Sequence, residues 1–88
     1  MTVTLDGLQM QDRASAHDHL KAQLMLPDYY GRNLDALYDL LTERGQPLEI
    51  TLSNESILTD LLGDYGEAIL QTLREAAEAN SALTLIEE

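Results

Sequence analysis

Asp35 and Asp39 stand four residues apart in the segment LDALYDLLT, and their spacing is the clearest hint of chemistry in this 88-residue chain. On an α-helix, residues four apart lie on one face. Paired carboxylates serve as acid and base in glycoside hydrolysis, but an exposed helix face gives neither group the desolvation that acid catalysis requires. From the pattern alone, the simplest interpretation is an ordinary helix with a solvated acidic face, but the tyrosines, glycine and threonine next to the acids favour a binding surface.

Other catalytic and metal-binding patterns are missing. The sequence has no P-loop, no GxGxxG and no nucleophile elbow, and it has no cysteine for thiol or disulfide chemistry. His17 and His19 flank Asp18, but helix residues two apart face different sides and do not easily share an ion. We therefore expect a protein that is not an enzyme and that uses no metal and no cofactor.

The two aspartates belong to a short amphipathic helix. Asp35, Asp39 and Thr42 recur at i, i+4 and i+7, on the flank of an apolar stripe. That stripe has helical spacing and is expected to face the core: Leu34, Leu37, Tyr38 and Leu41. The helix thus has an apolar side to bury and an acidic side to show.

A loop should fix where this helix begins. Pro27 restricts the backbone and Gly31 permits a turn, and Tyr29 and Tyr30 lie between them. Asn33 is expected to be the N-cap, because its short side-chain oxygen can accept from the free N–H groups of the first turn. After the helix, Gly45 is expected to provide the C-terminal stop.

The remaining segments alternate strands with pairs of helices. We expect strands at Thr2–Leu5, Leu48–Leu52 and Ala82–Ile86. The other helices are expected from a Ser15 cap to Leu24, from Asn54 or Ser56 to Leu62 with a stop at Gly63, and from Tyr65, capped by Asp64, to Asn80 in a left-handed conformation. This order predicts a parallel sheet joined by right-handed crossovers, in one domain over residues 1–88.

Acidic residues dominate the charge of the chain. Sixteen Asp and Glu against five Lys and Arg give a net charge of −11, which repels nucleic acid and attracts a basic protein. The alternative is that the charge only keeps a small protein soluble. The first residues lack a signal-peptide pattern and no segment is apolar enough to span a membrane, so we expect a cytoplasmic protein without membrane contact.

The segment LPDYYGRNLDALYDLL resembles the signature of the barstar family, intracellular inhibitors of secreted bacterial ribonucleases. The PLEITL strand and the late ILQTLREA helix follow in matching order, so the resemblance covers nearly the whole chain. It implies an α/β fold, a three-stranded parallel sheet with about four helices packed against it. It also implies a function: an acidic helix and the loop before it block the active site of a microbial ribonuclease by mimicking RNA phosphates.

The resemblance also implies roles for individual residues. Asp39 would be the anchor in the phosphate-binding pocket of the enzyme, with Asp35 as a second acidic contact. Tyr29 would pack near the catalytic histidine of the enzyme. The complete set of residues expected to bind the partner is Tyr29, Asn33, Asp35, Tyr38, Asp39, Thr42 and Glu75.

Some positions depart from the family pattern. Glu43 and Arg44 replace a glycine and an aromatic residue at the expected rim of the contact, and Ala79 replaces an acidic residue. These changes bear on which partner is bound. The expected partner is a basic, extracellular-type ribonuclease or related toxin, with this chain acting as a monomeric immunity protein or antitoxin. The alternative is an interaction module of the same fold whose target is a different basic protein.

Overall fold

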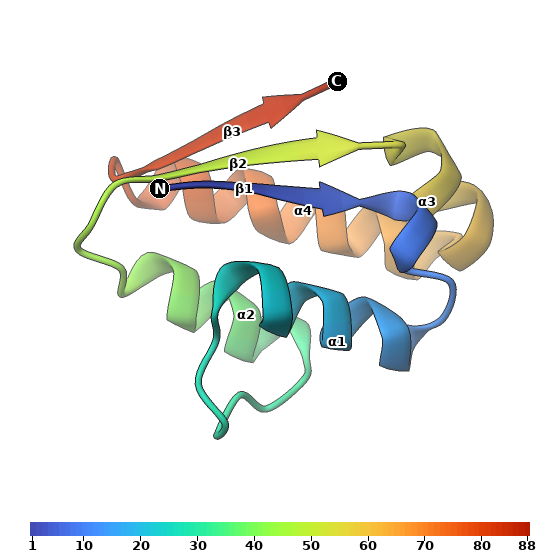
Figure 1. The fold of residues 1–88 in the computed structure, drawn as a ribbon, viewed down its shortest axis with the longest axis horizontal. Coiled ribbons are helices and arrows are strands. Elements are labelled where there is room, and N and C mark those ends of the chain that lie inside the picture. The colour runs from blue at the N-terminus through green and yellow to red at the C-terminus, as the bar shows by residue number, and fades with distance from the viewer.

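The computed structural model describes residues 1–88, and they form an α/β fold with a three-stranded sheet (Figure 1). The strands are β1 (Thr2–Asp6), β2 (Leu48–Ser53) and β3 (Leu83–Glu87), all parallel and in the order β1-β2-β3. The helices are α1 (Arg13–Leu24), α2 (Leu34–Thr42), α3 (Glu55–Leu62) and α4 (Asp64–Ala79), with a 3-10 turn, η1 (Gly7–Gln9), after β1. The predicted parallel sheet with four helices is therefore confirmed. None of the helices has the length and apolar composition needed to cross a membrane.

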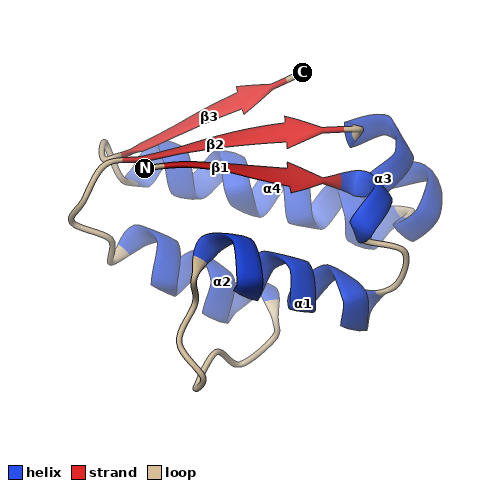
Figure 2. Cartoon of the chain, viewed as in Figure 1, coloured by secondary structure: helices blue, strands red, loops and turns tan.

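The sheet buries one face and leaves the other open. Figure 2 shows α1, α2 and α4 on the same side of the strands, as expected when successive right-handed crossovers advance in one direction. Val3 pairs with Ile50 and Ile50 with Leu85, so their side chains form one apolar row under the sheet. Thr2, Glu49 and Thr84 form the neighbouring row on the open, exposed face.

The start of α1 differs from the prediction. Asp12, not Ser15, is the N-cap, and its carboxylate accepts from the Ser15 N–H at 2.7 Å. The Ser15 hydroxyl in turn accepts from the Asp12 N–H at 3.0 Å. This reciprocal capping box satisfies two backbone donors, so the helix begins three residues earlier than a Ser15 cap would allow.

One predicted helix end is wrong, and a second has a different backbone conformation from the one predicted. Gly45 does not adopt a left-handed conformation, and α2 ends instead on Glu43 in a right-handed conformation, with φ −81° and ψ −10°. Asn80 ends α4 as predicted, but with φ −129°, which is extended backbone and not left-handed. By contrast, Gly63 ends α3 with φ 55°, as predicted, but Asp64 is the first residue of α4 and not its cap.

Asn54 precedes α3 and confirms one of the two predicted starts. It has a left-handed backbone with φ 55°, and its side chain does not cap the helix but donates to the Asp6 carboxylate at 2.8 Å. Gly7 lies against the same loop, because a Cβ at that position would be 2.2 Å from the Asn54 carbonyl oxygen. The end of β1 and the start of α3 are therefore in direct backbone contact.

Candidate partner-binding surface

Helix α2 separates apolar and acidic side chains as the sequence predicted. Leu37 and Leu41 are buried in the core, whereas Asp35 and Asp39 are exposed. Tyr38 is half-buried between the two sides. The carboxylates of Asp35 and Asp39 make no hydrogen bond or ion pair within the molecule, so both are free to bind an external cation.

The loop before α2 directs two adjacent tyrosines in opposite directions. Tyr29 is 80% exposed, while Tyr30 is only 5% exposed. The Tyr30 N–H donates to the Pro27 carbonyl at 2.9 Å, which closes the turn. Asn33 is the N-cap, as predicted: its side-chain oxygen accepts from the Ala36 N–H at 2.7 Å. Both the loop and the first turn of α2 are therefore held before any partner arrives.

A buried histidine fixes this loop to the rest of the protein. The two ring nitrogens of His17 hydrogen-bond to the hydroxyls of Tyr30 at 2.7 Å and Tyr65 at 2.6 Å. Burial, and then the charges of Arg32 and Arg13, lower the pKa of His17, so the neutral ring is favoured. Burial also raises the pKa of Tyr30 to about 12. The network therefore joins α1, the loop and α4 through uncharged groups.

This role of His17 was not predicted from the sequence, where the HDH triplet suggested only a metal site. In the structure the three residues of the triplet face different partners. Asp18 pairs with Arg32 at 2.7 Å, and the His19 Nε2 accepts from the Asp6 N–H at 3.0 Å. His17 shares helical spacing with the buried Leu20, and that pattern could have identified it as a core residue.

Asn80 holds the other end of α2 from outside the helix. Its amide nitrogen donates to the carbonyls of Leu41 at 2.9 Å and Arg44 at 2.8 Å, with a longer contact to Thr42 at 3.5 Å. Its side-chain oxygen accepts from the Ala82 N–H at 3.0 Å. One side chain thus satisfies carbonyls at the end of α2 and ties them to the loop before β3.

Thr42 is half-buried in the last turn of α2. Its hydroxyl donates to the Tyr38 carbonyl at 2.9 Å, with a second approach to the Asp39 carbonyl at 3.2 Å. Because the hydrogen points back into the helix, the lone pairs of the oxygen are left for a donor on another molecule.

Glu43 and Arg44 differ in how they face the solvent. Glu43 is exposed. Arg44 is half-buried, and its guanidinium donates to the Leu24 carbonyl at the end of α1 at 3.4 Å and approaches the Met1 sulfur at 3.7 Å. Arg44 therefore connects the ends of two helices, and only part of its side chain is available at the expected rim.

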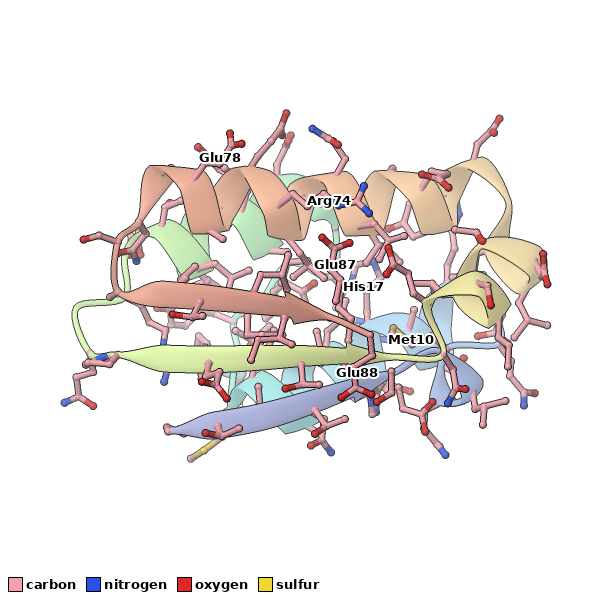
Figure 3. The ribbon with its side chains drawn as sticks, turned by 90° about the horizontal axis from the view of Figure 1, so that it is seen from above. Met10, His17, Arg74, Glu78, Glu87 and Glu88 are labelled. Atoms are coloured by element: carbon pink, nitrogen blue, oxygen red, sulfur yellow. The ribbon has the colours of Figure 1, made fainter.

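Glu75 is exposed on α4, which packs against α2. Its carboxylate accepts from the Gln71 amide at 3.4 Å. The preceding residue, Arg74, points toward the end of β3, where it pairs with Glu87 at 2.6 Å (Figure 3). Figure 3 also shows Glu78 on the outer side of α4.

Comparisons with known proteins agree with this architecture. Residues 1–85 match the family described as Barstar (barnase inhibitor). The chain is also 42% identical over 77 residues to a Bacillus subtilis (strain 168) protein named "Putative ribonuclease inhibitor YrdF", and the match covers 86% of this chain and 85% of that protein. The chain belongs to the barstar family, which confirms the resemblance seen in its sequence.

Proposed function

We propose that this protein is an intracellular inhibitor of a ribonuclease and that it blocks the active site of the enzyme with α2 and the preceding loop. Membership of the barstar family and the similarity to a protein named as a ribonuclease inhibitor support this function. The observation that carries the proposal is the exposed, unpaired state of Asp35 and Asp39 on a helix that is fixed at both ends.

The charge of the surface suits such a target. A ribonuclease must bind the phosphates of RNA, so its active site should be lined by Lys and Arg. Carboxylates on a rigid helix can occupy the same positions, and charge-assisted hydrogen bonds from arginine are stronger than neutral ones. The net charge of −11 would speed the encounter with a basic enzyme and would repel RNA itself.

The other expected contacts have distinct parts in this proposal. Tyr29 offers a large aromatic ring that is already exposed and loses little freedom on binding. Thr42 offers an acceptor oxygen at the far end of α2, and Glu75 adds a carboxylate from α4. Asn33 acts mainly by holding the first turn, and Tyr38 supplies an aromatic surface between the two sides of α2.

An inhibition assay tests the proposal. Increasing amounts of the protein are mixed with barnase, and with small basic ribonucleases encoded beside its gene, and cleavage of a fluorogenic RNA substrate is followed. The expected result is activity that falls linearly to zero at one equivalent of inhibitor. Unchanged cleavage at tenfold excess with every enzyme would reject the proposal.

A second candidate is a module that neutralises a different basic protein, such as a toxin of other chemistry. The observation that favours it is the altered rim, where Glu43 adds an exposed carboxylate and Arg44 is directed toward α1. In both cases the protein would act as a cytoplasmic immunity protein, a single domain that is monomeric until it meets its target. A toxin that binds one-to-one without ribonuclease activity would favour this second candidate.

A further inference from the structure

A hollow of about 420 Å³ lies where the first turns of α1, α2 and α4 meet. We name it the basic hollow, and it is lined by Arg13, His17, Arg32, Asn33, Leu34 and Tyr65. Asn33 and its neighbours belong to the loop and the first turn of α2, so the hollow adjoins the proposed binding surface. It is a positively charged depression at the edge of an otherwise acidic surface.

The positive charge of the hollow is unusual for this chain. Only five residues are Lys or Arg against sixteen Asp and Glu, yet two of the five line this one depression. Arg13 lies in none of the ion pairs and makes no hydrogen bond. Its guanidinium carbon instead lies 4.0 Å from the centre of the Tyr65 ring. An arginine without an anionic partner in a protein of net charge −11 has its donors available for a ligand.

Arg32 keeps part of its binding capacity as well. It pairs with Asp18 at 2.7 Å and donates to the Ala14 carbonyl at 3.0 Å. The Asp18 side chain is largely exposed, and a solvated pair of this kind contributes little. A guanidinium has five N–H donors in a planar fork, so donors remain for another carboxylate.

His17 holds in place the groups that position both arginines. Its bond to the Tyr65 hydroxyl holds the ring on which Arg13 lies, and its bond to Tyr30 holds the loop that carries Arg32. Burial is the main cause of the lowered pKa of His17, and the nearby charges of Arg32 and Arg13 add to it, while the Asp18 carboxylate opposes it. The hollow therefore combines the hydrogen-bonded rings of His17 and Tyr65 with the cationic side chains of Arg13 and Arg32.

We propose that the basic hollow binds an acidic side chain of the partner enzyme, next to the basic groove that receives Asp35 and Asp39. This inference rests on the proposed function, because α2 would bring the partner into place. An RNA strand carries a row of phosphates and is repelled by the overall charge of −11, whereas a single carboxylate meets mainly the two arginines of the hollow. A carboxylate on a mostly basic protein can still reach the hollow, because the basic surface around it is attracted to the acidic protein. The positive charge of the hollow would repel a ribonuclease that has a Lys or Arg at the matching position. The hollow would in this way help to determine which enzyme is bound.

The first experiment uses sodium acetate as a carboxylate probe on the free protein. Amide and arginine side-chain signals are followed by NMR during titration, against sodium chloride at equal ionic strength. The proposal predicts saturable shifts, specific to acetate, around Arg13, Arg32 and Asn33, which disappear in the Arg13→Met, Arg32→Met double variant. Shifts that are equal in chloride, or that persist in this variant, would overturn it. The unfolding midpoint of each variant confirms that the fold is intact.

The second experiment measures binding to a ribonuclease that the wild-type protein inhibits. Arg13→Met should raise the dissociation constant at least tenfold, and Lys21→Met, which removes a half-buried cation outside the hollow that pairs with Asp28 at 3.3 Å, should leave it unchanged. Equal binding by the Arg13 variant and the wild type, while Asp39→Ala binds weakly, would overturn the role of the hollow and leave the proposed function standing. If the wild type inhibits no ribonuclease, the proposed function fails, and the acetate titration still decides whether the hollow accepts carboxylates.

Discussion

Replacement of Asn80 by alanine should destabilise the protein far more than its position after a helix suggests. Its side chain makes two short donor bonds to carbonyls near the end of α2 and one acceptor bond to the Ala82 N–H. A typical hydrogen bond contributes about 0.5–1.5 kcal/mol to stability. Because the site is half-buried and water can replace part of what is lost, we expect a loss of about 2–3 kcal/mol in the free energy of unfolding.

Urea denaturation measures this loss directly. A change of this size is a large fraction of the roughly 5–15 kcal/mol that stabilises a typical domain, so the midpoint should shift clearly. Asn80→Asp should be at least as damaging, since it keeps the acceptor but turns an anionic oxygen toward the carbonyls of Leu41 and Arg44. Ser81→Ala, at an exposed neighbour, should change stability by no more than about 0.5 kcal/mol. A loss for Asn80→Ala as small as that of the control would refute the role assigned to the Asn80 side chain.

Three further predictions concern pH, backbone contact and salt. Burial lowers the pKa of His17 and of His19, so the unfolded chain takes up protons first. Stability should therefore be highest above pH 6.5 and should fall as pH decreases toward the lower folded pKa values, by at most about 1.4 kcal/mol per pH unit for each histidine. Urea unfolding at pH 7.5 and 5.5 tests this, and equal stability would count against it. Gly7→Ala should lose more than about 2 kcal/mol, because its Cβ would clash with the backbone of Asn54, whereas Gly45→Ala, with no atom nearby, should be neutral in the same measurement. Added salt should slow association with the ribonuclease in stopped-flow experiments, and a salt-independent rate would exclude electrostatic steering.

The elements with strong periodicity could be predicted from the sequence. Leu48, Ile50 and Leu52 alternate with more exposed residues, and they form the central strand with its apolar face on the core. Leu37 and Leu41 have helical spacing and are buried, which leaves Asp35 and Asp39 on the outside. In these segments the local pattern and the tertiary environment agree, so a reading of the pattern is enough.

The helix ends could not be predicted as well, because several residues compete for each cap. Asp12 and Ser15 both have side chains suited to an N-cap. Which of them is the cap depends on the backbone conformation of the residues between them, which allows the two reciprocal hydrogen bonds. Asn80 was expected to end α4 by a local conformation, but its amide reaches carbonyls 36 to 39 residues earlier in the chain. Such a contact depends on how α2 and α4 pack and leaves no local pattern.

The proposed binding surface also has features that could be predicted from the sequence and features that could not. The exposure of Tyr29 and of the acidic side of α2 followed from sequence pattern and resemblance, and the structure has both. The network around His17 joins residues 13 and 48 positions away, and the inward direction of Arg44 depends on the end of α1. The roles of the predicted contact residues in binding remain predictions.

The most direct test of the central claim compares Asp39→Ala with Asp60→Ala in binding to an inhibited ribonuclease and in unfolding. Both carboxylates are exposed and unpaired, so each variant should unfold within about 0.5 kcal/mol of the wild type. Removing one partner of a buried ion pair costs about 3–5 kcal/mol, so Asp39→Ala should weaken binding at least a hundredfold. Asp60→Ala should bind like the wild type. Equal binding by the two variants, or an equal loss of stability and affinity in Asp39→Ala, would contradict the claim that the acidic side of α2 is the inhibitory surface.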